Sequence, residues 1–197
     1  MSESHPFEEV PADHELFLLL ADIAAEHDVP IAIHMDLVVD DMNTPDFFVS
    51  HSEKNPETLE ENLASFERLL AHNRNAKIVW AHVGSDTTGV LTPDVVRELF
   101  EEHSNLYADL RLTGSPTKGH ELLSKGFSGT LSEDWRELIE EYPTRFTLGS
   151  DAFFGNEKQD NAQSAGTLFL SQLSEETAVQ VGCANAVALY NLAVSCQ

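Results

Sequence analysis

Residues 145–155 read RFTLGSDAFFG, where an apolar run typical of a buried strand leads through Gly149 and Ser150 to an aspartate, Asp151. An aspartate in this position is either a solvated turn residue or part of a site formed where strands end. Three other segments have the same character, and segments of helical periodicity separate them. They are VPIAIHMDL (29–37), AKIVWAHVG (76–84) and NLYADLRL (105–112).

The segments around these strands are predicted to be helices. Residues 14–27 form the first of them, with leucines and an isoleucine at helical spacing: Leu16, Leu19, Leu20 and Ile23. Three more are predicted to begin at capping residues followed by an apolar face: at Asn55–Pro56 (with Leu59, Leu63, Phe66 and Leu70), at Thr92–Pro93, and at Ser132. The last helices are predicted over 157–172, 175–182 and 184–194.

Strands that alternate with helices predict an α/β fold with a parallel sheet, in which ligands bind at the carboxyl ends of the strands. His34, His82 and Asp151 would occupy equivalent positions at that edge. The segments 38–54 and 112–131, rich in Gly, Ser, Thr, Pro and Asp, are predicted to be long loops there.

Each of these three residues has an ordinary explanation, because a histidine or aspartate near a strand end is commonly a hydrogen-bonded or turn residue. Together they favour one site, since two imidazoles and a carboxylate suit zinc or a similar divalent ion. Asp36 would either orient His34 or face water. Arg111 would either pair internally with Asp109 or bind a substrate carboxylate.

The charge of the chain restricts its partners. Lys and Arg number 11 against 34 Asp and Glu, a formal net charge of −23, which opposes binding to nucleic acid and to anionic membranes. A high-salt cytoplasm is one habitat that would select such a surface. No apolar run is long enough to cross a bilayer and the N-terminus lacks secretory features, so we expect a cytoplasmic protein acting on a small molecule. Cys183 and Cys196 are expected to be reduced.

The four strand segments, in order, resemble the last four strands of the amidohydrolase superfamily, and more closely the amidohydrolase-related metal-dependent hydrolases with a TIM-barrel fold. CANAVALYNL (183–192) resembles the Gly-Asn-Ala helix that often ends those chains, with Cys183 and Ala184 directly before Asn185. The resemblance implies that His34 is a metal ligand. It implies that His82 binds a second metal or contacts the attacking water or the substrate. Asp151 would be both ligand and general base in hydrolysis of an amide, ester or lactone.

The chain departs from this family in lacking a His-x-His pair and in its length, because a complete barrel typically needs about 250 residues. We therefore expect residues 14–197 to be the C-terminal half of a barrel, strands five to eight, after a tail at 1–13. Open sheet edges predict a homo-oligomer or association with a separate N-terminal half. The alternatives are non-oxidative decarboxylation, with Arg111 binding the substrate carboxylate, and a non-catalytic α/β interaction module or degenerate fragment.

Overall fold

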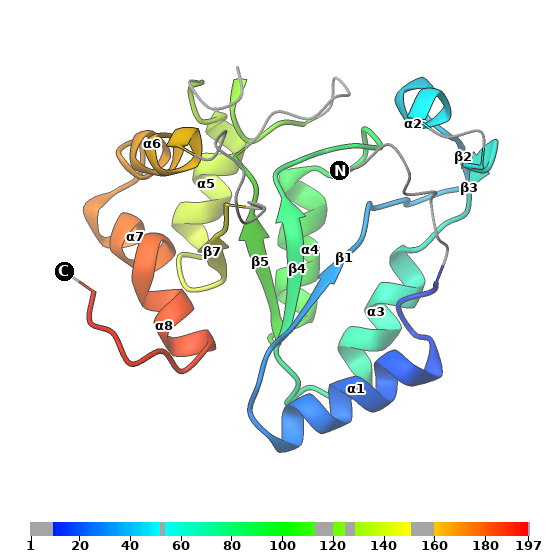
Figure 1. The fold of residues 1–197 in the computed structure, drawn as a ribbon, viewed down its shortest axis with the longest axis horizontal. Coiled ribbons are helices and arrows are strands. Elements are labelled where there is room, and N and C mark those ends of the chain that lie inside the picture. The colour runs from blue at the N-terminus through cyan, green and yellow to red at the C-terminus, as the bar shows by residue number, and fades with distance from the viewer. Residues whose placement is uncertain (1–9, 52–53, 113–119, 125–128, 151–159, 197) are drawn as a thin grey trace.

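Four parallel strands form the sheet of the computed structural model, which describes residues 10–51, 54–112, 120–124, 129–150 and 160–196. Their order in the sheet, β1-β4-β5-β7, follows their order along the chain, as in an α/β barrel (Figure 1). The bounds are Ile31–His34 for β1, Ile78–Val83 for β4, Leu106–Leu110 for β5 and Phe146–Leu148 for β7. The predicted α/β fold is confirmed, and the open sheet is consistent with part of a TIM barrel.

Helices flank the sheet along its length. In Figure 1, α1 and α3 lie on the side of β1, α4 lies behind the strands, and α6, α7 and α8 lie on the side of β7. The helices are α1 Glu15–Glu26, α3 Leu63–His72, α4 Pro93–Glu102, α5 Glu133–Glu141, α6 Asp160–Leu170, α7 Glu175–Val179 and α8 Asn185–Leu189, with the π-helix η2 Gln180–Ala184 between the last two. No helix in the described ranges is long and apolar enough to cross a membrane.

The predicted start of α4 is confirmed at atomic detail. Thr92 is the N-cap, and its side-chain oxygen accepts a hydrogen bond of 3.2 Å from the backbone N–H of Val95. Pro93 occupies the first turn, where backbone N–H groups have no partner within the helix, so a residue without an N–H loses no hydrogen bond. The buried face of α4, which includes Leu99 and Phe100, then packs against the sheet.

Helix α1 forms where predicted, but its apolar stripe faces outward. Leu16 and Leu19 are 64% and 54% exposed, and Leu20 and Ile23 are exposed as well. The buried positions of this helix are Ala21 and Ala24. Periodicity therefore predicts the helix and not which face the rest of the chain covers.

The helix predicted from Asn55–Pro56 is confirmed over Leu63–His72, but its predicted start is wrong. Two short strands pair in antiparallel fashion in this region, β2 (Met42–Asn43) and β3 (Thr58–Leu59), and a short helix α2 (Asp46–His51) lies between them. The Asn55 amide donates to the backbone oxygen of Phe48 at 2.6 Å instead of capping a helix. The segment 38–54 is thus not a continuous loop.

Helix α3 begins at Leu63 after Asn62, whose side chain has a different task from capping. Its Oδ1 accepts from the backbone N–H of Val38 at 2.9 Å, and its Nδ2 donates to the backbone oxygen of Asp36 at 2.9 Å. These two bonds fix the chain that leaves β1. The helix does begin after a polar residue that precedes an apolar stripe, but this residue is Asn62, seven positions after Asn55.

The cysteines were expected to be reduced, and this expectation is wrong. Cys183 and Cys196 form a disulfide, with a Cα–Cα distance of 5.8 Å that lies within the usual range. Helix α8 ends at Leu189, and the chain after it returns toward η2. The spacing of 13 residues between the two cysteines does not by itself predict that the chain turns back and forms this disulfide.

Candidate metal site at the ends of strands β1 and β4

His34 and His82 lie in direct contact at the carboxyl ends of β1 and β4. Their Nδ1 atoms are 2.8 Å apart, and the two rings meet edge to face with centroids 4.9 Å apart. One Nδ1 must carry a proton and donate it to the other in this arrangement. The predicted proximity of the two histidines is therefore present in the fold.

A backbone irregularity in β4 makes this contact. His34 pairs in register with Ala81, so strand alternation would turn the next residue, His82, to the opposite face of the sheet. The register between β4 and β5 shifts between Ala81 and Val83, and His82 has a φ of +68°. This bulge turns His82 toward His34, at the cost of a left-handed conformation that few non-glycine residues adopt.

Asp36 lies behind the His34 ring. Its Oδ2 is 3.3 Å from Nε2 of His34, and its Oδ1 accepts a short hydrogen bond from the Thr87 hydroxyl. Burial acts to raise the pKa of Asp36, but the hydrogen bonds from His34 and Thr87 outweigh it and hold the pKa below its ordinary value. The carboxylate is therefore ionised and positioned to orient the imidazole.

The loop after β4 completes this support, and the sequence prediction did not include it. The Thr88 hydroxyl donates to the backbone oxygen of Leu37 at 2.6 Å, beside the bond from Thr87 to Asp36. The two threonines tie the loop after β4 to the segment after β1. The run GSDTTG (84–89), polar yet directly following an apolar strand, is the sequence signal that would have found them.

Asp86 organises the same loop from within. It is fully buried, and its Oδ1 accepts from the backbone N–H groups of Gly89 at 2.7 Å and Leu91 at 3.1 Å. Its Oδ2 accepts from the backbone N–H of His120 at 2.9 Å. One buried carboxylate thus joins the loop after β4 to the segment after β5.

Two other residues considered from the sequence, Arg111 and Asp109, lie farther along the same edge. The backbone N–H of Arg111 donates to the backbone oxygen of Val83 at 3.0 Å, which places Arg111 beside the end of β4. Asp109 accepts from the Thr147 hydroxyl at 2.8 Å, so this carboxylate interacts with β7. Asp151 lies outside the described residues.

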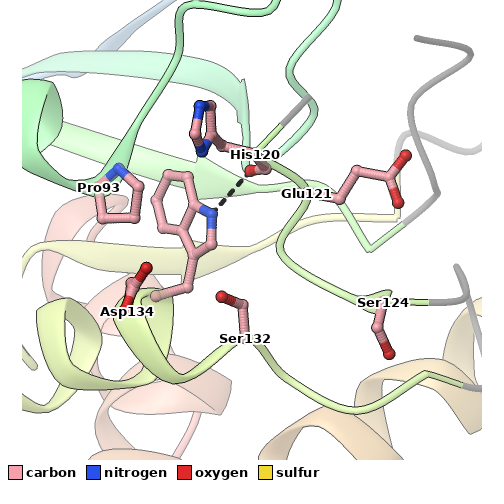
Figure 2. Close-up of a pocket in the computed structure, with 7 residues that line it drawn as sticks. Pro93, His120, Glu121, Ser124, Ser132 and Asp134 are labelled. Atoms are coloured by element: carbon pink, nitrogen blue, oxygen red, sulfur yellow. Dashed lines mark hydrogen bonds between the residues drawn. The ribbon is translucent and has the colours of Figure 1, made fainter. Parts of the chain in front are cut away.

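A hollow of about 390 Å³ opens near this edge, between the segment after β5 and the start of α5. Figure 2 shows Pro93, His120 and Ser132 around this hollow, and the Trp135 Nε1 donates to the backbone oxygen of His120 at 2.8 Å. Its lining residues are Pro93, His120, Glu121, Ser124, Ser132, Asp134 and Trp135. Neither histidine of the pair is among them, so this hollow is separate from the His34–His82 contact.

The histidine pair fits a divalent metal ion by its donor chemistry. The two Nδ1 atoms lie next to each other, and a carboxylate holds the far nitrogen of His34, which is the usual outer support of a metal-binding histidine. The spacing of 2.8 Å would have to widen slightly, because nitrogens bound to one zinc ion lie about 3.3 Å apart at bond lengths of about 2.0 Å. The side chain of His34 is 47% exposed, which leaves room for this movement.

These features define an α/β protein with a histidine-centred site at the carboxyl edge of its parallel sheet. A family model described as amidohydrolase matches residues 4–192, and the chain belongs to this family. No curated protein matches the sequence. Family membership assigns a hydrolase type of function in broad terms and confirms the resemblance seen in the strand segments.

Proposed function

We propose that this chain is a metal-dependent hydrolase in which an activated water attacks the carbonyl carbon of an amide, ester or lactone. The observation that carries the proposal is the 2.8 Å approach of His34 Nδ1 to His82 Nδ1 at the carboxyl edge of the sheet. Without an ion the two nitrogens share a hydrogen bond, and they need only lose the shared proton and separate slightly to bind one ion.

The residues divide the work by position. His34 and His82 would hold the ion through their Nδ1 atoms, and zinc is the ion that this donor set suits. When bound, such an ion lowers the pKa of water and polarises a carbonyl group. Asp36 would hold His34 in the tautomer that has its proton on Nε2, leaving Nδ1 free to bind.

Two further roles complete the proposal. Asp151, from the segment after β7, would be an additional ligand and would accept the proton of the attacking water. Arg111, beside the end of β4, would bind a carboxylate of the substrate. The substrate would be a small molecule, since a chain of net charge −23 repels polyanions.

The test is metal-dependent hydrolysis by the purified chain. The protein is stripped with chelator, reloaded with zinc, manganese or cobalt, and assayed with aryl esters, lactones and anilides. Each proposed ligand is replaced singly, as His34→Ala and Asp151→Asn. His27→Ala is the matched control, because His27 is exposed at the end of α1, away from the carboxyl edge.

The proposal expects turnover that needs metal, falls at least a hundredfold in His34→Ala and Asp151→Asn, and is unchanged in His27→Ala. Release of carbon dioxide from aromatic carboxylic acids, without hydrolysis of esters or lactones, would show that the chain is a non-oxidative decarboxylase and not a hydrolase. Absence of bound metal, with no change of melting temperature on adding zinc, would favour a non-catalytic module.

A further inference from the structure

Three side chains converge at the other end of the sheet from the histidine pair. His103 follows α4 and precedes β5, so it lies at the amino end of β5, whereas His34 and His82 lie at carboxyl ends. Glu102 is the last residue of α4, and Glu67 comes from the neighbouring helix α3. One oxygen of each glutamate and one ring nitrogen of His103 lie within 4.8 Å of one another.

His103 is the unusual member of this group. It is only 4% exposed, yet neither of its ring nitrogens has a hydrogen-bond partner among the described residues. A buried polar group left without a partner costs about 1–3 kcal/mol, so such groups in folded proteins call for an explanation. Oε2 of Glu102 lies 4.0 Å from Nε2, which is too far for a hydrogen bond.

The distances leave space for an ion between the three side chains. Ligand atoms bound to one zinc ion are about 3.3 Å apart, given bond lengths of about 2.0–2.2 Å. The observed spacings would therefore contract by roughly an ångström on binding. The Glu102 side chain is 68% exposed and can make that movement without disturbing the core.

The backbone beneath the group is held firmly. Asn105 donates through Nδ2 to the backbone oxygens of Leu70, Asn73 and Ala76, at 3.2, 3.3 and 3.0 Å, which joins the end of α3 to the start of β5. The Arg145 guanidinium donates to the backbone oxygen of His103 at 2.5 Å. The ring of His103 is thus presented from a fixed position.

The charges at this place suit a cation. Burial lowers the pKa of His103, and the positive charge of Arg74 acts in the same direction. These two effects outweigh the Glu67 and Glu102 carboxylates, which act to raise the pKa, so the ring is neutral at neutral pH. A neutral imidazole is the form that binds metal. Arg74, which donates to the backbone oxygen of Glu102 at 2.5 Å, supplies one positive charge against the two carboxylates.

We propose that Glu67, Glu102 and His103 form a second divalent-metal site, of the zinc and cobalt class, that links α3 to the junction of α4 and β5. Its role would be to stabilise the fold, because a bound ion would connect two adjacent helices and satisfy the buried imidazole. It shares no residue with the His34–His82 pair and does not depend on the proposed hydrolase function.

The test uses a chain without the first site, carrying His34→Ala and His82→Asn. Zinc binding is followed by titration calorimetry and by the melting temperature, and cobalt binding by its visible absorption. Glu67→Gln with Glu102→Gln removes the proposed ligands without touching a buried side chain. Glu26→Gln with Glu137→Gln, at exposed positions on other helices, is the charge-matched control. His103→Gln is added as a third variant.

In the chain carrying His34→Ala and His82→Asn, zinc should raise the melting temperature. The control pair Glu26→Gln/Glu137→Gln should keep this rise. Glu67→Gln/Glu102→Gln should lose it and bind zinc at least tenfold more weakly. If His103→Gln folds, it should bind zinc as weakly as Glu67→Gln/Glu102→Gln does. If it does not fold, the comparison of Glu67→Gln/Glu102→Gln with the control pair is the test. The proposal is overturned if the background chain binds neither ion, or if the glutamate pair binds as tightly as the control pair. Loss of hydrolysis with this site intact would count only against the proposed function.

Discussion

His82 reaches His34 only because the backbone of His82 leaves the regular strand conformation. Its φ of +68° coincides with the register shift between Ala81 and Val83, and the result is an Nδ1–Nδ1 distance of 2.8 Å. Left-handed backbone at a non-glycine residue costs of order 1 kcal/mol and is concentrated at functional sites. The left-handed backbone at His82 therefore destabilises the fold locally, and this same conformation brings the two imidazoles together.

The first prediction separates the backbone of His82 from its side chain. His82→Gly and His82→Asn should fold with stability near that of the native chain, because both residues tolerate a positive φ. His82→Ala should be less stable than His82→Gly by about 1 kcal/mol, measured by urea denaturation. Equal stability of the alanine and glycine variants would show that the strain is absent. All three should weaken zinc binding at the histidine pair.

A second prediction concerns the close approach of β5 to Gly149. A Cβ at Gly149 would collide with the Asp109 carboxylate, which is held by the Thr147 hydroxyl at 2.8 Å. Gly149→Ala should therefore lower the free energy of unfolding by about 1–3 kcal/mol. Combining it with Asp109→Ala should recover part of that loss, as a positive coupling in a double-mutant cycle.

The control for this prediction is Gly166→Ala in α6, where an added Cβ would make only an ordinary contact with Leu148 at 3.4 Å. An alanine within a helix is favoured over glycine, so this variant should be neutral or slightly stabilising. Similar losses in the two alanine variants would contradict a specific collision with Asp109.

A third prediction follows from Glu140, which joins α5 to the start of α7. Its Oε1 accepts from the backbone N–H of Ser174 at 2.6 Å, and its Oε2 accepts from the Ser174 and Thr177 hydroxyls. Burial acts to raise the pKa of Glu140, but these hydrogen bonds outweigh it and lower the pKa. Glu140→Gln should cost about 1 kcal/mol at pH 7, a value reduced for partial solvent exposure.

The pH dependence of that cost has a definite sign. Because the pKa is lower in the folded state, the unfolded chain binds more protons as pH falls through about 4.3. The stabilisation by Glu140 is therefore complete above that pH and is lost below it. The native chain and Glu140→Gln should differ at pH 7 and converge as the pH falls below the lowered pKa of the folded state, with the exposed Glu137→Gln as control. A difference that stays constant with pH would exclude this origin.

A fourth prediction concerns association. Leu16 and Leu19 are more than half exposed on α1, the helix that precedes the edge strand β1. We expect a second copy of the chain to cover this face, more readily in salt that screens the charge of −23. Light scattering over a dilution series should show a dimer or larger, and Leu16→Ser with Leu19→Ser should shift it to monomer, unlike Val49→Ser. A native chain that stays monomeric over the whole dilution series would refute this self-association. Binding of a separate N-terminal half would show that this half, and not a second copy of the chain, covers the face.

The sequence predicted the elements that local physics determines. Strands β1, β4, β5 and β7 follow from short apolar runs, and α4 follows from Thr92–Pro93 before an apolar face. The predicted start of the helix at Asn55 is wrong because a capping signal is local, whereas the β2–β3 pair forms between separate segments of the chain. The disulfide between Cys183 and Cys196 was missed for the same reason, since it depends on the path of the chain after α8.

The site was predictable in part. Strand ends identified His34 and His82, and Asp36 followed as a residue near His34 able to orient it. The bulge at His82 could not be predicted, because nothing in IVWAHV departs from an ordinary strand pattern. The support from Thr87 depends on how one loop packs on another, which short-range periodicity does not describe.

A metal site shared by His34 and His82 is tested by the ¹⁵N spectrum of the imidazole rings, recorded without and with zinc and assigned through His34→Gln and His82→Asn. Zinc should shift the Nδ1 resonances of both His34 and His82 together to values typical of metal-bound nitrogen. Nε2 of His34 should keep its proton, because it faces Asp36 at 3.3 Å. Rings that do not respond to zinc, or a shift confined to Nε2, would contradict a metal site built on the His34–His82 contact.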